Sequence, residues 1–134
     1  ELRIMNQELS NKIKTFTDLI AWKEGHKLVL YIYGITKKFP KDEMFGLTSQ
    51  LKRCSVSITS NIAEGFSRQY YKEKLQFYSM ALGSVTELQN QIFIARDVGY
   101  INDLDFNSCS DLAINVHKII NGLIKKTREI IHNS

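Results

Sequence analysis

A single proline, Pro40, and only seven glycines occur in a chain of 134 residues. Proline interrupts a helix because it lacks the backbone N–H and its ring clashes with the preceding turn, and interior glycine weakens a helix. No segment alternates apolar and polar residues at the two-residue period of a half-buried strand. The sequence therefore predicts long, uninterrupted helices and an all-α fold.

Apolar residues recur at three- and four-residue steps in four stretches, which is the spacing of one face of an α-helix. The predicted helices cover residues 19–38, 48–66, 70–98 and 103–131. Their connections are short, and short connections place successive helices antiparallel. We therefore expect an antiparallel up-down-up-down four-helix bundle over residues 16–134. Residues 1–15 are expected to form an N-terminal arm that is flexible or docks on a partner.

Short polar side chains near two of the predicted helix starts can accept hydrogen bonds from the unpaired N–H groups of a first turn. Thr17 or Asp18 is expected to cap the first helix, and Asn102 or Asp103 the fourth. The core-facing stripes predicted for these two helices are Leu19, Trp22, His26, Val29, Ile32 and Tyr33, and then Leu112, Val116, Ile119, Leu123 and Ile130.

Glycines fall both at predicted helix ends and inside helices. Gly65 and Gly99 are expected to close the second and third helices, because glycine readily adopts the left-handed conformation found there. Gly34, Gly83 and Gly122 lie inside helices, where each costs roughly 1 kcal/mol relative to alanine. They either face solvent or mark a close approach by another helix, of the same chain or of another subunit. The serine that follows Gly83 favours a close approach at that position.

Composition excludes several classes of protein. Hydrophobic residues make up 43% of the chain and charged residues 24%, which is typical of a globular domain. The longest apolar runs are only a few residues, whereas about 20 are needed to span a bilayer, so no membrane partner is expected. Cys54 and Cys109 lie far apart and form no CxxC pair, which predicts two buried thiols in a reduced, cytoplasmic protein.

No motif for a catalytic or cofactor site is present. The sequence lacks HExxH, GxxxxGK[ST], GxGxxG and GxSxG. Cys54 lies on an apolar stripe and is expected to be buried. We therefore expect no enzyme, no cofactor and no metal. A small enzyme that uses Cys54, or the pair Asn61 and Glu64, is a weaker alternative.

Polar residues crowd the second predicted helix, although serine, threonine and asparagine are poor helix formers. Ser57, Asn61 and Glu64 share one face there, and Ser84 and Glu87 share a face of the third helix. The two faces either are solvated or meet in a hydrogen-bonded seam. A buried seam fixes the register of two helices more than it stabilises them.

The net charge of +4 is polarised along the predicted bundle. One end gathers an excess of cations: Lys12, Lys14, Lys23, Arg68, Lys72, Lys74, Lys125, Lys126 and Arg128. A solubilising surface is one explanation. The other is a nucleic-acid interface in which phosphates contact the cations and Tyr70 and Tyr71 stack on unpaired bases. The candidate binding residues are Arg68, Lys72, Lys74, Lys125, Lys126 and Arg128.

One run of residues is more specific than these patterns. Residues 57–65 read Ser-Ile-x-x-Asn-Ile-Ala-Glu-Gly, and residues 83–88 read Gly-Ser-x-x-Glu-Leu. Phe16-Thr17-Asp18-Leu19 precedes them and Gly99-Tyr100-Ile101 follows. Over residues 16–131 the chain resembles the bacterial four-helix bundle proteins called 23S rRNA-intervening sequence proteins, also labelled S23 ribosomal protein.

The resemblance implies an antiparallel four-helix bundle that assembles as a ring-shaped homopentamer, with no settled activity. Its motif positions, to which no catalytic role transfers, are Arg53, Ser57, Asn61, Glu64, Gly65, Gly83, Ser84 and Glu87. A related pentameric bundle, the accessory variability protein of diversity-generating retroelements, binds nucleic acid and a reverse transcriptase. The polarised charge and the family resemblance together give the first hypothesis, a non-enzymatic homo-oligomer that binds RNA or another nucleic acid through a basic face. The alternative is a protein-interaction scaffold, such as an accessory subunit of a nucleic-acid enzyme.

Overall fold

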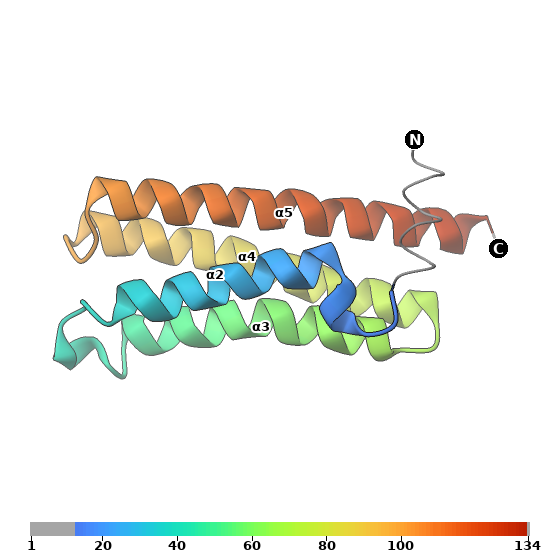
Figure 1. Cartoon of the computed structure of the whole chain (residues 1–134), viewed down its shortest axis with the longest axis horizontal. Coiled ribbons are helices and arrows are strands. Elements are labelled where there is room, and N and C mark those ends of the chain that lie inside the picture. Colours follow the sequence, from blue (N-terminus) through green and yellow to red (C-terminus); the bar gives the residue numbers. More distant parts are fainter. Residues whose placement is uncertain (1–12, 134) are drawn as a thin grey trace.

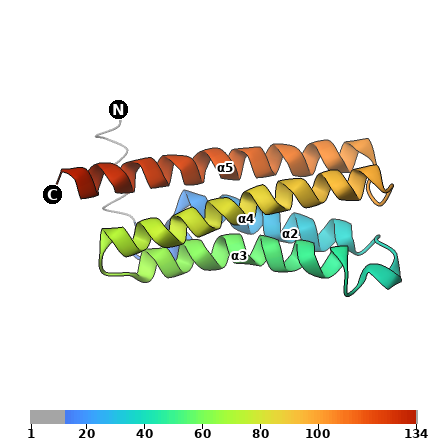
Figure 2. The same cartoon turned by 180° about the vertical axis from the view of Figure 1, so that it is seen from behind.

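The computed structural model describes residues 13–133 and consists of four long helices with two short 3-10 helices before and between them (Figures 1 and 2). The long helices are α2 (Ile20–Thr36), α3 (Leu47–Ser67), α4 (Tyr71–Asp97) and α5 (Asp103–His132). The short ones are η1 (Phe16–Asp18) and η2 (Lys41–Glu43). Residues 13–133 contain no strand, so the predicted all-α class and the four helices are confirmed. Residues 1–12 of the predicted arm, including Lys12, and Ser134 lie outside the described part.

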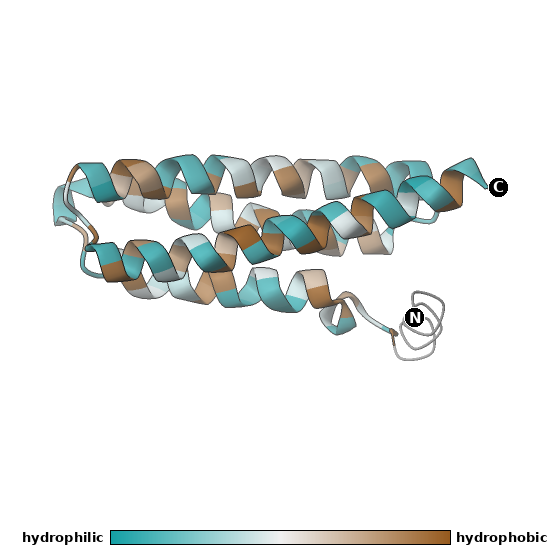
Figure 3. Cartoon of the chain, turned by 90° about the horizontal axis from the view of Figure 1, so that it is seen from above, coloured by the Kyte–Doolittle hydropathy of each residue, from teal (hydrophilic) through white to brown (hydrophobic). Residues whose placement is uncertain are grey.

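The four helices alternate in direction, so that α2 and α4 run one way and α3 and α5 the other (Figure 1). Each helix packs on two neighbours, in the order α2, α3, α4, α5 and back to α2. Apolar residues (brown) recur at intervals among polar residues (teal) along the helices, as their three- and four-residue spacing in the sequence predicts (Figure 3). The largest fully buried side chains are Leu28, Ile32, Leu51, Ile58, Ile62, Leu88, Ile92 and Ile120. No helix within residues 13–133 is long and apolar enough to cross a bilayer.

The core-facing stripe of α2 is rotated from the predicted one. Val29 and Ile32 are buried as predicted. Leu28 and Ile35, which the predicted stripe leaves out, are buried as well. Tyr33 is 40% exposed, with the Lys52 ammonium 4.9 Å from its ring centre. In α5, Val116 is fully buried as predicted, but on the next turn Ile120 is fully buried and the predicted Ile119 is half-buried. Both helices pack between two neighbours, so their apolar sector is wide and a single line of spacing does not fix its centre.

The start of α2 differs from the prediction, whereas the start of α5 agrees with it. Leu19 is the residue at the N-cap of α2. Asp18 instead stabilises the preceding turn, since its carboxylate accepts from the N–H groups of Lys14 at 2.9 Å and Thr15 at 3.1 Å. These hydrogen bonds lower the pKa of Asp18. Asn102 caps α5 as predicted, because its side-chain oxygen accepts from an N–H of the first turn at 2.7 Å.

The two glycines predicted to close helices have different roles. Gly99 ends α4 as predicted, with φ at 87°, and the N–H groups of Gly99 and Tyr100 bond back to Arg96 and Ala95. The prediction for Gly65 is wrong: it lies inside α3, and only Gly99 has a positive φ among residues 13–133. A Cβ at Gly65 would lie 2.6 Å from a ring carbon of Tyr78, so glycine permits the close approach of α4.

No atom of residues 13–133 outside the local backbone lies within 4 Å of where a Cβ would be at Gly34, Gly83 or Gly122. These three glycines therefore mark no close contact among the described residues. A close approach by a neighbouring helix of the described chain is therefore excluded as the reason for these glycines. A solvent-facing position and a contact with another subunit are the two explanations left.

Candidate functional site

Serines at the middle of α3 and α4 join the two helices. The hydroxyls of Ser57 and Ser84 lie 2.9 Å apart, and the Asn61 amide donates to both the carbonyl and the hydroxyl of Ser57. The Cys54 thiol donates to the carbonyl of Ser84 at 2.9 Å. These four residues form a continuous polar seam between α3 and α4, in which Cys54 is buried and the other three are half-buried.

A charged group extends the seam toward the start of α3. Arg53 forms an ion pair with Glu87 of α4 and also donates to the Gln50 side chain at 2.9 Å. Gln91 donates to Glu87 at 3.0 Å, and the other side-chain atom of Gln91, its oxygen, is buried without a partner among the described residues. Sequence reasoning missed Gln91, although it lies one helical turn after Glu87 and so shares its face.

Three other motif residues do not join the seam. Glu64 pairs with Arg68 one turn later, at 3.2 Å. Gly83 is exposed on the outside of α4, and Gly65 is buried against Tyr78. The structure thus brings together Arg53, Ser57, Asn61, Ser84 and Glu87, and the role it gives the seam is to hold α3 and α4 in register.

The thiols lie in environments that suppress nucleophilic chemistry. Burial, with the Glu87 charge as a lesser cause, raises the pKa of Cys54 from 9.0 to about 12. Burial also raises the pKa of Cys109 from 9.0 to about 12. A thiol attacks as the thiolate, so both side chains are inert near neutral pH. Among residues 13–133 no group of three or more histidine, cysteine or acidic side chains could hold a metal ion.

Lys74, one of the candidate nucleic-acid ligands, is bound within the bundle. Its ammonium donates to the carbonyls of Phe66 at 2.7 Å and Gly65 at 3.4 Å, in the last turn of α3. A cation at this place satisfies carbonyls that have no partner within the helix and interacts favourably with the helix dipole. Burial lowers the pKa of Lys74. Its ammonium therefore has a structural role.

Lys74→Met is expected to lower the free energy of unfolding by about 1 kcal/mol, because it removes a charged hydrogen-bond donor from the end of α3. Urea denaturation measures this change. Lys72→Met is the matched control, since Lys72 is exposed on the same turn of α4 and makes no such contact. Equal stability of the two variants would contradict this role for Lys74.

Arg68 is also engaged. Its guanidinium pairs with Glu64 at 3.2 Å, lies 4.0 Å from Glu73, and stacks over the Phe77 ring at 4.6 Å. Its Nε is buried without a hydrogen-bond partner within the described chain. These contacts join the end of α3 to the start of α4, so the guanidinium is not free to bind a phosphate.

Four of the predicted ligands form no ion pair, hydrogen bond or ring contact with any other residue that the structure describes. Three are exposed and one, Lys126, is half-buried. They come from the start of α4 and the last turns of α5, which lie at the same end of the bundle (Figure 1). We call them the free cations: Lys72, Lys125, Lys126 and Arg128.

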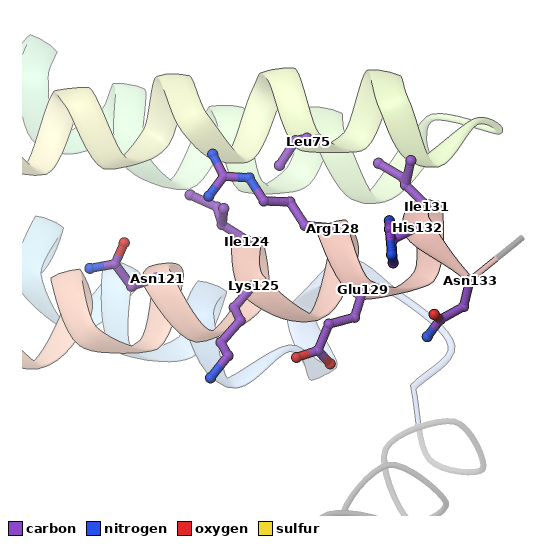
Figure 4. Close-up of a pocket in the computed structure, with 9 residues that line it drawn as sticks. All are labelled: Leu75, Asn121, Ile124, Lys125, Arg128, Glu129, Ile131, His132 and Asn133. Atoms are coloured by element: carbon purple, nitrogen blue, oxygen red, sulfur yellow. The ribbon is translucent and has the colours of Figure 1, made fainter.

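A surface hollow lies beside the free cations, between the start of α4 and the end of α5 (Figure 4). Arg128 extends toward α4, whereas Lys125 points away from it. The hollow combines apolar walls with cations and one carboxylate. Its lining residues are Leu75, Asn121, Ile124, Lys125, Arg128, Glu129, Ile131, His132 and Asn133.

Comparisons with known proteins agree with this fold. A family model described as 23S rRNA-intervening sequence protein matches residues 17–122, most of the chain. The chain is similar to a crystal structure of a protein of unknown function from the S23 ribosomal protein family of Bacteroides thetaiotaomicron. The TM-score is 0.74 at 19% sequence identity, and the match covers 79% of this chain and 96% of the other. The search among curated proteins returns no match.

Proposed function

The chain belongs to the 23S rRNA-intervening sequence protein family, and on that premise we propose that it is a non-enzymatic, homo-oligomeric bundle that binds RNA or another nucleic acid through the free cations. The observation that carries the proposal is that these four side chains are unpaired within the described chain. A paired cation gains little from a phosphate because it loses its own carboxylate partner. A free cation gains the phosphate contact and releases counterions from the nucleic acid.

Two exposed aromatic side chains at the same end favour single-stranded regions. Tyr70 is 64% exposed and Tyr71 is 46% exposed, and both lie at the start of α4 beside Lys72. Stacking on such rings holds unpaired bases with little dependence on their sequence. A single strand or a loop would bind with its phosphates on the free cations and its bases stacked on the two tyrosines.

Self-assembly would strengthen this interface. A homo-oligomer repeats the free cations on each copy, and a ligand that contacts several copies binds with higher avidity than one contact allows. The ring of five copies implied by the family resemblance would place five such sets around one surface. We assign this activity to the cytoplasm, where structured RNA is available and the two free thiols stay reduced.

The test replaces all four free cations with glutamine and measures binding of a labelled single-stranded RNA and a labelled RNA hairpin by fluorescence anisotropy. We expect the affinity to fall by at least about a hundredfold at low salt, because phosphate contacts dominate non-specific binding. The dependence of log K on log salt should also flatten, by roughly 0.7 for each phosphate of a single strand that the variant no longer neutralises.

The matched control removes the same charge elsewhere, with Lys38, Lys41, Lys52 and Lys118 replaced by glutamine. This variant is expected to keep most of the affinity. If both variants bind equally well, or if the wild-type protein binds neither RNA at low salt, the assignment of the nucleic-acid interface is wrong.

A second candidate function is supported at the opposite end of the bundle. Phe45 is 91% exposed and Met44 is 56% exposed in the connection between α2 and α3. Exposed apolar side chains of this size are typical anchors in protein–protein contacts. They favour a protein-interaction scaffold, such as an accessory subunit of a nucleic-acid enzyme. Binding to a partner protein that persists at high salt and is lost in Phe45→Ser would support this function.

A further inference from the structure

The burial of one face of α5 changes along the helix. Cys109, Val116, Leu123 and Ile130 follow one another at seven-residue steps, so they lie on nearly the same side of α5. Cys109 and Val116 are fully buried, whereas Leu123 and Ile130 are only half-buried. The last two side chains are large and apolar, so their exposure reflects what lies opposite them in the bundle.

The helix opposite this face of α5 begins too late to cover its last turns. The Asn115 amide of α5 donates to the Glu24 carboxylate of α2 at 3.1 Å. Because the two helices are antiparallel, Ile20, the first residue of α2, is about level with Ile119. Residues 120–132 of α5 therefore extend about 20 Å beyond the start of α2 (Figure 1).

The short helix η1 covers a different part of this end. It precedes α2 and packs against α2 and α3. The helices on which α5 packs are α2 and α4. Beyond the start of α2, no long helix within residues 13–133 therefore occupies the fourth position of the bundle beside Leu123 and Ile130.

The segment that precedes the described residues carries a stripe of the same length. Leu2, Met5 and Leu9 recur at three- and four-residue steps, which is the spacing of one helix face. Leu2 and Leu9 are seven residues apart, as are Leu123 and Ile130. The apolar span of the segment therefore matches the half-buried span of α5.

We propose that residues 2–9 form an amphipathic helix that packs antiparallel on the last turns of α5, in the position that α2 leaves open. Leu9 then lies against Leu123. Leu2 lies against Ile130, and Met5 lies between these two contacts. The antiparallel direction follows from the chain, because the segment approaches α2 from its N-terminal side and α2 is antiparallel to α5.

The covalent connection identifies this segment as the occupant. Leu9 needs to lie only about one helical turn beyond the start of α2, and residues 10–19 provide the link. A short link also gives the segment a high effective concentration at α5, whereas another protein must be bound from solution. A helix this short is marginal alone, so its contact with α5 is what would stabilise it.

Hydrogen exchange of the full chain, followed by mass spectrometry, tests the contact. Met5→Asp places a charge within the stripe. We expect it to speed the exchange of amides 123–132 at least about tenfold, because the last turns of α5 lose their cover and open more often. The amides of residues 107–119, which lie level with α2, should keep their wild-type rates.

Ile4→Asp is the matched control. It also replaces an apolar side chain of the segment with aspartate, but Ile4 lies outside the stripe of Leu2, Met5 and Leu9. This variant should exchange as the wild-type protein does. Equal exchange of amides 123–132 in the two variants would overturn the proposal.

Disulfide trapping identifies the surface on which the segment docks. Leu9→Cys with Leu123→Cys is expected to form a disulfide within one chain under mild oxidation, which leaves a chain of monomer mass with two free thiols after denaturation. Leu9→Cys with Leu112→Cys is the control, since Leu112 is half-buried like Leu123 but lies level with α2. The native thiols of Cys54 and Cys109 are buried and do not compete.

Each outcome of the trapping has one meaning. A disulfide between two chains shows that the segment docks on another copy, and it overturns the contact within one chain. No disulfide with Leu123→Cys, or equally fast formation in both double variants, overturns it as well. None of these readouts depends on RNA or on the mass of an oligomer, so this inference and the proposed function fail separately.

Discussion

Gly65→Ala is expected to lower the free energy of unfolding by about 1–3 kcal/mol, as overpacked core substitutions do. The added Cβ would lie 2.6 Å and 2.9 Å from two ring carbons of Tyr78 and 3.1 Å from the Cβ of Phe77. The Tyr78 ring is buried, so it cannot swing into solvent to make room. Either α4 moves away from α3 or the ring leaves its preferred rotamer. Urea denaturation at a fixed chain concentration measures the change.

Gly83→Ala is the control, because nothing among the described residues lies within 4 Å of its Cβ position. There alanine gains its intrinsic helix propensity without a clash, so stability is expected to rise by about 0.5–1 kcal/mol. The two substitutions are chemically identical and lie in neighbouring helices. If Gly65→Ala proves as stable as the wild-type protein, the close approach of Tyr78 to α3 is not a tight constraint.

Gly65→Ala and Gly83→Ala are expected to change the stability in opposite directions, which shows what the sequence can and cannot predict. A glycine near the end of an apolar stripe is a signal for a left-handed helix end, and that reasoning is right for Gly99. The same local signal occurs at Gly65, where the cause is a tyrosine thirteen residues later on another helix. Nothing within one turn of Gly65 distinguishes the two cases, because the difference lies in the packing of α3 on α4.

In the polar seam, too, some contacts follow from the spacing within one helix and others depend on how two helices pack. Helical spacing correctly groups Ser57 with Asn61, and Ser84 with Glu87, since one helix face is a local property. Spacing also places Glu64 on that face, but an arginine one turn later offers Glu64 a partner in its own helix. The partner with which an acid pairs depends on the distance between helices. The spacing of residues within one helix does not give that distance.

Charge alone predicts the candidate cations as one group. The structure divides this group into cations that are bound within the bundle and cations that are unpaired among the described residues. Lys74 binds the final carbonyls of α3 because a three-residue connection brings the first turn of α4 back to them. Arg68 sits in that connection, between two acids. Both positions follow from the tightness of the turn. Among the free cations, Lys72 lies on the same turn of α4 as Lys74 and the other three lie on α5. No carboxylate of the described residues pairs with any of them, and spacing along the sequence does not separate the two groups.

Raising the pH from 8 to 10 is expected to destabilise the protein by about 3 kcal/mol through its two cysteines. In the folded state burial raises the pKa of Cys54 and of Cys109 from 9.0 to about 12, so both thiols stay protonated over this range. In the unfolded chain they ionise near pH 9. The unfolded state therefore binds fewer protons than the folded state, and stability falls as the pH rises.

The size of this loss of stability follows from the ionisation of the two thiols in the unfolded chain. At pH 10, about one unit above its ordinary pKa, each thiol stabilises the unfolded state by about 1.4 kcal/mol through ionisation, and the two add to about 3 kcal/mol. This stability is fully present below pH 9 and would be lost progressively until the folded thiols themselves ionise near pH 12. Burial also raises the pKa of Tyr78 from 10.0 to about 12, so tyrosine ionisation adds to the slope above pH 10.

Urea denaturation at pH 8, 9 and 10 measures the effect, and the double variant Cys54→Ala with Cys109→Ala is its control. The double variant is less stable at every pH, because it leaves two small cavities and removes the thiol that donates to the Ser84 carbonyl. Its stability should nevertheless change much less between pH 8 and 10, since the groups responsible are absent. Equal slopes in the two proteins would mean that the folded thiols ionise as readily as the unfolded ones, and the seam would then be open to water.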